Sequence, residues 1–248
     1  MHLPEIFSLA KAFEQYFEIV PAFSDALKDD VYRIRHQVYC EELAYEPQRP
    51  DRRESDEYDA HSLHVLIRSV KTGEFVGCTR IIRAQPQDSY YPLPFENICA
   101  AALDRSIVDP AKLRRDTIAE VSRLAVIAGF RKRKNDGKRL VSISDQDFGT
   151  ATQPRFPYIP VSLYLATVEL ARLNGIDTLF VLTDERLASH FRKLGVDIQT
   201  IGAPVEHRGK RIPSMINAGG IIKNLGVIFR PLYRTIAAQV AVGVNHSA

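Results

Sequence analysis

The sequence predicts an α/β (α+β) fold in which a mixed central β-sheet is flanked by helices. Two observations carry this prediction. Several antiparallel-type strands come first, and a strand–helix–strand succession follows in the C-terminal half. The composition agrees, because 45% of the 248 residues are hydrophobic and 25% are charged, which is ordinary for a chain that buries a core. Since no linker or internal repeat is evident, we expect one domain over residues 1–248.

The N-terminal half is expected to begin with a helix and to continue into strands. Apolar residues at helical spacing predict an amphipathic N-terminal helix within residues 1–15, and a strand follows over 17–21. Ser24 is a suitable N-cap for a helix that runs to about residue 42. A polar loop over 46–61 comes next. The apolar runs after it predict strands over 62–70, 75–84 and 117–127.

The C-terminal half is expected to alternate helices and strands. Its expected elements are an irregular, initially basic insertion over 129–160, a helix over 161–174, a strand over 178–183, a helix over 185–194, strands over 196–201 and 211–217, and a helical extension over 218–243. Gly175 and Gly195 close the first two helices. Gly226 and Pro231 should interrupt the apolar extension. This segment can pack on the core or lie peripherally on the inner membrane face.

Composition and motifs exclude several classes of function. Lys and Arg number 33 against 30 Asp and Glu, and a net charge of +3 argues against a dedicated nucleic-acid binder. Cys40, Cys78 and Cys99 lack metal-ligand spacing, which fits a reducing compartment and argues against a zinc site. GxSxG, HExxH and GxGxxG motifs are absent, so we expect no metal and no resident cofactor. With no evident signal peptide, a cytoplasmic location is expected.

Charged residues stand inside strands that are otherwise apolar. Arg80 lies within the strand predicted over 75–84, and Glu120 and Arg123 lie within that over 117–127. A buried charge is costly unless it is paired. These three side chains should therefore meet partners, which the acidic loop before residue 62 can supply. A purely structural ion-pair network explains the same pattern, and both interpretations stay open.

The spacing of Glu120 and Arg123 predicts an irregularity in their strand. Residues three apart face opposite sides of a regular strand. A β-bulge between them would bring both side chains to one side and would also open the sheet for a ligand. We therefore expect a bulge here, and an unbroken strand over residues 120–123 would contradict that expectation.

These charged residues follow a recognisable order. The pattern is an Arg with an aromatic four residues on, a second aromatic, Glu-x-Asp-x-x-Asp, Gly-x-x-Arg and Glu-x-x-Arg. It is formed by Arg35 and Tyr39, Tyr45, Glu54, Asp56 and Asp59, Gly77 and Arg80, and Glu120 and Arg123. The set resembles the signature of the acyl-homoserine-lactone (autoinducer) synthases and of the N-acyl amino acid synthases, which share the GNAT-type acyltransferase fold. Over its whole length, including residues 204–214, the chain more closely resembles the PEP-CTERM/exosortase system-associated acyltransferases.

The resemblance implies an enzyme that moves a fatty acyl group from a thioester to the amine of a small acceptor, an amino acid in the leading interpretation. Acyl carrier protein is the expected donor, ahead of acyl-CoA. Glu120 takes the role of general base by resemblance, with Arg123 as a second catalytic residue. The other members would form an electrostatic cluster that shapes the acceptor pocket: Arg35, Tyr39, Tyr45, Glu54, Asp56, Asp59 and Arg80.

Two other functions remain open beside this one. Tyr39 and Tyr45 replace the usual Phe and Trp of the lactone synthases, which favours an acceptor other than S-adenosylmethionine. A lactone synthase that uses S-adenosylmethionine is still the second enzyme interpretation. The third is a non-catalytic GNAT-fold binding module of a PEP-CTERM/exosortase surface or polysaccharide system.

A basic stretch in the insertion is a candidate docking surface for the carrier. Residues 130–139 hold six basic side chains and one acidic one. Acyl carrier protein is acidic, and a basic patch would steer it toward the enzyme. A solvated loop, or a contact with CoA phosphates or anionic lipid, would explain the same charge. The candidate docking residues are Arg131, Lys132, Arg133, Lys134, Lys138 and Arg139.

Overall fold

The computed structural model describes residues 3–88, 91–131, 149–150, 153–154, 156–193 and 195–245. Eight strands form one sheet with the order β1-β2-β3-β4-β7-β10-β8, and β9 pairs with β10. The strands are β1 (Phe17–Pro21), β2 (Ser62–Ser69), β3 (Phe75–Arg83), β4 (Ile118–Val126), β7 (Thr178–Thr183), β8 (Ile198–Thr200), β9 (Val205–Glu206) and β10 (Lys210–Asn217). Neighbouring strands run antiparallel except β4 and β7, which are parallel. The mixed sheet is the one predicted.

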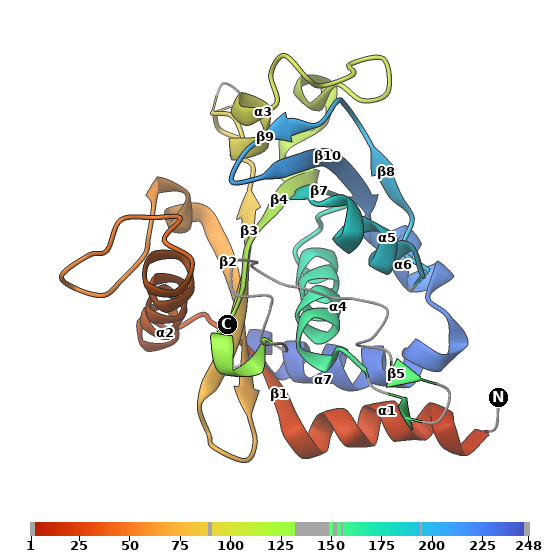
Figure 1. The fold of residues 1–248 in the computed structure, drawn as a ribbon. Helices are drawn as coiled ribbons and strands as arrows, with labels where there is room; N and C mark the ends of the chain where they lie inside the picture. The colour runs from red at the N-terminus through yellow and green to blue at the C-terminus, as the bar shows by residue number, and fades with distance from the viewer. Residues whose placement is uncertain are drawn as a thin grey trace.

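Helices cover both faces of the sheet (Figure 1). The helix α2 (Asp25–Arg35) lies on one face of β2, β3 and β4, and α4 (Tyr158–Leu173) lies on the other. The chain leaves β4, passes through α4 and returns as β7, which is the crossover that a parallel pair requires. The remaining helices are α1 (Leu3–Tyr16), α3 (Pro94–Ile98), α5 (Glu185–Lys193), α6 (Ala218–Asn224) and α7 (Arg230–Asn245).

Short helices and a second pair of strands complete the described elements. The 3-10 helices are η2 (Glu57–His61), η3 (Pro110–Lys112), η4 (Arg115–Thr117), η5 (Ala128–Phe130) and η7 (Val227–Phe229), and a two-stranded sheet joins β5 (Gly149–Thr150) to β6 (Gln153–Pro154). The expected ends of the sheet strands agree with the structure to within two residues. Apolar alternation and turn residues therefore locate these strands well.

The helix expected from Ser24 to residue 42 is present but changes its type. The hydroxyl of Ser24 accepts a hydrogen bond from the Leu27 backbone N–H, as an N-cap should. After Arg35, the chain continues as the π-helix η1 (His36–Glu42). A bond from the Leu43 N–H to the Val38 carbonyl, five residues back, marks the wider turn.

The C-terminal extension packs on the core. Leu232, Ile236 and Val240 of α7 are fully buried, and α7 contacts α1, α4 and β1. Of the two alternatives, the structure shows core packing. Gly226 separates α6 from η7, but the expectation that Pro231 interrupts the helix is wrong. Pro231 lies in the first turn of α7, where a helix tolerates a missing N–H. In the described parts of the chain, every helix is too short or too polar to cross a membrane.

The sheet is split near its centre. β4 pairs with β7 over only four residues, from Ile118 opposite Thr178 to Val121 opposite Val181. β4 then continues to Val126 along β3. Past Val121, β4 and β7 have no further pairing in the described structure, and the gap between them holds the cavity discussed below.

Candidate active site

A β-bulge in β4 lies next to this gap. In the pairing of β3 with β4, Arg80 is opposite Ser122 and Cys78 is opposite Ala125, so Thr79 alone faces Arg123 and Leu124. The φ of Arg123 is 53°, an uncommon value for a residue other than glycine. Both Ser122 and Arg123 consequently lie on the α2 face of the sheet, together with Glu120. The expected bulge is confirmed.

Three arginines and three carboxylates meet on that face. The Arg35 Nε lies 2.5 Å from Glu54, and its Nη1 lies 2.6 Å from Asp59. The Arg80 Nη1 lies 2.6 Å from Asp56 and 2.8 Å from Asp59. These four contacts join the helix α2, the acidic loop and strand β3.

Strand β4 is tied to the same cluster at two points. The Arg123 Nη2 lies 3.0 Å from Glu54 and 3.4 Å from Asp56. One residue earlier, the Ser122 hydroxyl accepts a hydrogen bond from Arg80 Nε at 3.1 Å. The formal charges of the six side chains balance. Arg35, Arg80, Arg123, Glu54, Asp56 and Asp59 were all singled out from the sequence, and the structure brings them together.

Local backbone structure explains why the acidic loop can supply these carboxylates. Asp56 is the N-cap of η2, and its side chain accepts from the Tyr58 N–H at 3.1 Å. The Asp59 carboxylate accepts from the Asp56 N–H at 2.8 Å, which completes a capping box. Asp59 thus accepts from the backbone with Oδ2 and from the arginines with Oδ1, whereas Oδ1 of Asp56 accepts from both the Tyr58 N–H and Arg80.

The cluster is held in its charged form. Burial alone would raise the pKa of Glu54, but Arg35 and Arg123 outweigh it and lower this pKa to about 2. The pKa of Asp59 is lowered in the same way, by Arg35 and Arg80 against burial. Burial lowers the pKa of the neighbouring His64 to about 4, and Arg35 and Arg80 lower it as well, despite the nearby Asp59. His64 is therefore neutral at pH 7.

Glu120 has a different environment. Its side chain is buried, and one carboxylate oxygen accepts from the Phe95 N–H at 2.8 Å. Burial raises its pKa to about 7, although the Phe95 hydrogen bond and the charges of Arg80 and Arg123 act in the opposite direction. Two kinds of carboxylate thus lie on one face: paired ones that stay ionised, and Glu120, which exchanges its proton near neutrality.

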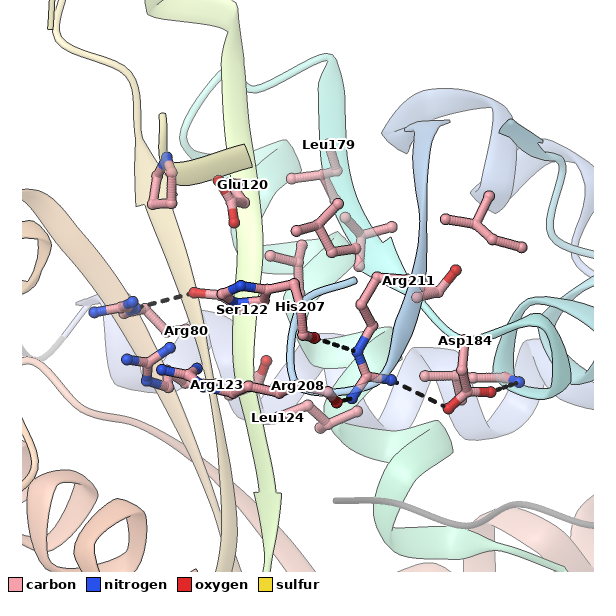
Figure 2. Close-up of a pocket in the computed structure, with 18 of the residues that line it drawn as sticks. Arg80, Glu120, Ser122, Arg123, Leu124, Leu179, Asp184, His207, Arg208 and Arg211 are labelled. Atoms are coloured by element: carbon pink, nitrogen blue, oxygen red, sulfur yellow. Dashed lines mark hydrogen bonds and ion pairs between the residues drawn. The ribbon is translucent and has the colours of Figure 1, made fainter. Parts of the chain in front are cut away.

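Glu120 faces a cavity of about 650 Å³ between β4 and β7. Figure 2 shows Glu120, Ser122, Arg123 and Leu124 along β4, with Arg211 and Asp184 on the other side. Its apolar wall is formed by Val121, Leu124, Leu179, Val181, Leu182, Leu187, Phe191, Ile198, Ile212 and Ile216. An apolar cavity with a few polar groups at one end is the usual form of a ligand site.

The two aromatic residues of the sequence pattern also line this cavity. Tyr39, from η1, lies beneath Arg123, whose Cζ is 5.4 Å from the centre of its ring. The Tyr39 hydroxyl donates to the Leu124 carbonyl at 3.3 Å, and burial raises its pKa. Tyr39 therefore contacts both the Arg123 side chain and the backbone of the bulge, and it helps to hold them in place. Tyr45 lies in the loop that follows η1.

Two hydroxyls in the cavity wall are available for a polar group of a ligand. Tyr164 of α4 and Thr183 at the end of β7 both line the cavity. Within the described chain, the Tyr164 Oη and the Thr183 Oγ1 are buried and have no hydrogen-bond partner. A buried hydroxyl without a partner is costly. A polar atom of a bound substrate would remove that cost.

Sequence reasoning did not single out the opposite wall of the cavity as functional. It is formed by His207, Arg208 and Arg211 of the β9–β10 hairpin and by Asp184 after β7. Glu46 joins this wall to the cluster, because Arg208 and Arg123 both contact it. The available signal was the basic run after residue 206.

Most of the candidate carrier-docking residues lie outside the described part of the chain. Arg131 is described, and it forms an ion pair with Glu42 at the end of η1. The other predicted docking residues, which the structure does not describe, are Lys132, Arg133, Lys134, Lys138 and Arg139. Their role in docking stays a prediction.

Comparisons with known proteins agree with this fold. Residues 34–138 match the model of the acetyltransferase (GNAT) domain family. An acyl-homoserine-lactone synthase of Pseudomonas fluorescens is 21% identical over 194 residues, 77% of this chain and 80% of that protein. The structure of the acyl-homoserine-lactone synthase LasI gives a TM-score of 0.56 at 20% identity, covering 88% of this chain and 94% of that one. FeeM, an N-acyl amino acid synthase from uncultured soil microbes, gives 0.52 at 15% identity, covering 84% and 94%.

The domain match and the fold define the class first: residues 34–138 match a GNAT acetyltransferase domain, and the chain has a GNAT-like fold. Within that class, it is similar in sequence to an acyl-homoserine-lactone synthase and similar in fold to both lactone synthases and an N-acyl amino acid synthase. The fold expected from the sequence is confirmed.

Proposed function

We propose that this protein is an N-acyltransferase that moves a fatty acyl group from an acyl thioester to the amine of a small acceptor, an amino acid. The observation that supports this most directly is Glu120. A buried carboxyl with a pKa of about 7, at the wall of a large and mostly apolar cavity, suits a general base for an amine.

The residues of the cavity suggest how transfer proceeds. The acceptor ammonium first loses one proton to solvent, and Glu120 accepts the second proton as the amine nitrogen attacks. The nitrogen forms a bond to the thioester carbonyl carbon, the C–S bond breaks, and the thiolate leaves and takes up the proton. On the side of β4 that faces β7, the backbone N–H groups beyond Val121 donate hydrogen bonds to the developing oxyanion. The acyl chain fits the apolar part of the cavity.

Acyl carrier protein is our proposed donor, ahead of acyl-CoA. The support is the concentration of basic residues over 130–139, which complements an acidic carrier. Such a reaction belongs in the cytoplasm, the location that the sequence predicts.

Reversing the charges of residues 131–134 to Glu should raise the KM for the acyl carrier protein and leave the KM for acyl-CoA within about threefold. An unchanged carrier KM would contradict the docking surface.

A second candidate is an acyl-homoserine-lactone synthase that uses S-adenosylmethionine as the acceptor. The relatives favour it, because both the sequence relative and LasI are lactone synthases. Release of methylthioadenosine during acyl transfer distinguishes the two enzymes. A lactone synthase releases one molecule of methylthioadenosine for each acyl group transferred, whereas an N-acyl amino acid synthase releases none.

The third candidate is a non-catalytic binding module associated with a PEP-CTERM/exosortase surface or polysaccharide system. The resemblance over the whole chain supports that association for the leading function as well. Unlike both enzymes, such a module would bind acyl carrier protein without consuming its thioester, and this difference can be measured.

Mass spectrometry of lipids from cells that express the protein tests the proposed function. Wild-type cells should accumulate N-acyl amino acids, and cells with Glu120→Gln should contain at least about 100-fold less, the scale of general-base loss. Glu57→Gln is a matched control, because it removes an exposed carboxylate from the acidic loop. It should accumulate product as the wild type does. Equal accumulation with Glu120→Gln would reject Glu120 as the base.

A further inference from the structure

The cavity wall opposite Glu120 carries a basic hairpin that the proposed reaction leaves without a role. β9 and β10 are joined at Arg208 and Gly209, whose φ values of 53° and 92° form the turn. Arg211 braces this turn: its Nη2 donates to the Arg208 carbonyl at 2.9 Å, and its Nε donates to the His207 carbonyl at 3.3 Å (Figure 2). The tip of the hairpin is thus held against the cavity.

Glu46 lies between two arginines from opposite sides of the cavity. Arg208 of the hairpin and Arg123 of the β4 bulge contact the same oxygen of Glu46, with Arg123 Nη2 at 3.5 Å. The side chains of Arg208, Arg123 and Glu46 are 27%, 16% and 21% exposed. Solvent therefore reaches this bridge and the neighbouring Asp56, whose side chain is 20% exposed, whereas Arg35, Arg80, Glu54 and Asp59 are buried.

The geometry also shows which arginines can meet a substrate. Arg35 is fully buried and is bound by Glu54 and Asp59. Arg80 is buried and is bound by Asp56 and Asp59. Arg123 is the partly exposed arginine of the cluster, and Arg208 faces it across Glu46. A carboxylate held by two guanidinium groups is a strong and geometrically specific contact.

We propose that Arg123 and Arg208 form a subsite for the carboxylate of the acceptor, and that the carboxylate of Glu46 occupies this subsite in the ligand-free protein. The inference rests on the proposed function, and it names the residues that bind the carboxylate of the amino acid acceptor. An acceptor carboxylate displaces Glu46 without changing the charge between the arginines. The amine of the same molecule then lies in the cavity that Glu120 lines.

Binding of two product-like ligands to the full chain tests the subsite without catalysis. N-dodecanoylglycine and N-dodecanoylglycinamide differ only in the carboxylate, and calorimetry gives their Kd values. The wild type should bind the acid at least about 10-fold more tightly than the amide, the scale of a charged hydrogen bond. Arg208→Gln should abolish this preference. Lys210→Gln, which removes an exposed cation from the same hairpin, should preserve it.

Glu46→Gln separates the subsite from a merely structural bridge. If Glu46 competes with the ligand, its loss should tighten binding of the acid about 3- to 10-fold and leave binding of the amide unchanged. If the bridge only holds the hairpin in place, Glu46→Gln and Arg208→Gln should weaken both ligands alike. That second result would overturn the proposal.

The remaining outcomes are equally decisive. Equal affinity of the wild type for acid and amide overturns the subsite, and acylation of amines would leave the proposed function standing. A carboxylate preference without acylation of any amine supports the subsite and rejects the proposed function.

Binding of CoA tests whether Arg208 contacts the phosphates of the acyl donor instead. If Arg208→Gln weakens CoA binding about 10-fold and leaves the acid preference intact, Arg208 binds the donor and the proposal is wrong.

Discussion

At the scale of single residues, Glu120 should control how the reaction depends on pH. A general base is active when deprotonated, and burial raises the pKa of Glu120 to about 7. We therefore expect kcat/KM to rise with pH through about 7 and to level off above about 8. The Glu120→Gln variant should lose this inflection along with most of its activity. A profile of the same shape in the variant would assign the titration to another group.

Arg35 should matter for stability rather than for contact with substrate. Arg35→Met leaves Glu54 and Asp59 buried with less positive charge beside them, which costs about 3–5 kcal/mol. Urea unfolding at pH 7 measures this loss. Arg33→Met is a matched control on the same helix, since its pair with Asp29 is exposed to solvent and its loss should change stability little. Similar losses in both variants would contradict a role for burial.

The charged residues of the cluster were predictable one by one, but their surroundings were not. A charge inside an apolar strand needs a partner, so Arg80, Glu120 and Arg123 stood out in the sequence. Glu46 and Arg208 lie 162 positions apart, and although Arg208 belongs to a basic run, nothing in the sequence pairs it with Glu46. Only the fold brings them to one cavity.

At the scale of elements, the approach of β3 to the bulge depends on Gly77. A Cβ at this position would lie 2.8 Å from the Ala125 carbonyl oxygen, which belongs to the backbone of β4. Gly77→Ala should therefore push the strands apart and cost about 1–3 kcal/mol. Thermal unfolding compares it with Gly129→Ala, where the added Cβ meets no atom within 4 Å. Equal melting temperatures of the two variants would contradict this close approach.

The elements differ in how well the sequence predicted them. Strand limits were predictable because apolar alternation and turn residues mark them. The π-helical turn of η1 was not predictable, because its residues suit an α-helix equally well. The bulge was predictable in kind, from the spacing of Glu120 and Arg123, although not to the residue.

At the scale of the whole molecule, α7 should be part of the folded core. Ile236 is fully buried in the cluster that includes residues of α4 and β1, so Ile236→Ala should cost about 2–5 kcal/mol. Val242 of the same helix is 55% exposed, and Val242→Ala should change stability by less than about 1 kcal/mol. Denaturant midpoints of the two variants check this difference. A small effect at Ile236 would mean that α7 is dispensable for folding.

The brief pairing of β4 with β7 has a mechanical consequence. Two slabs of sheet, β1 to β4 and β7 to β10, meet along only four residue pairs, with the cavity on the open side of that seam. The seam is the place where the two slabs can hinge relative to each other. A change in the twist between the slabs would change the separation of Arg123 and Arg208, which face each other just past the seam. The width of the cavity is thus expected to depend on this short junction and on the Glu46 bridge, which links the two slabs across it.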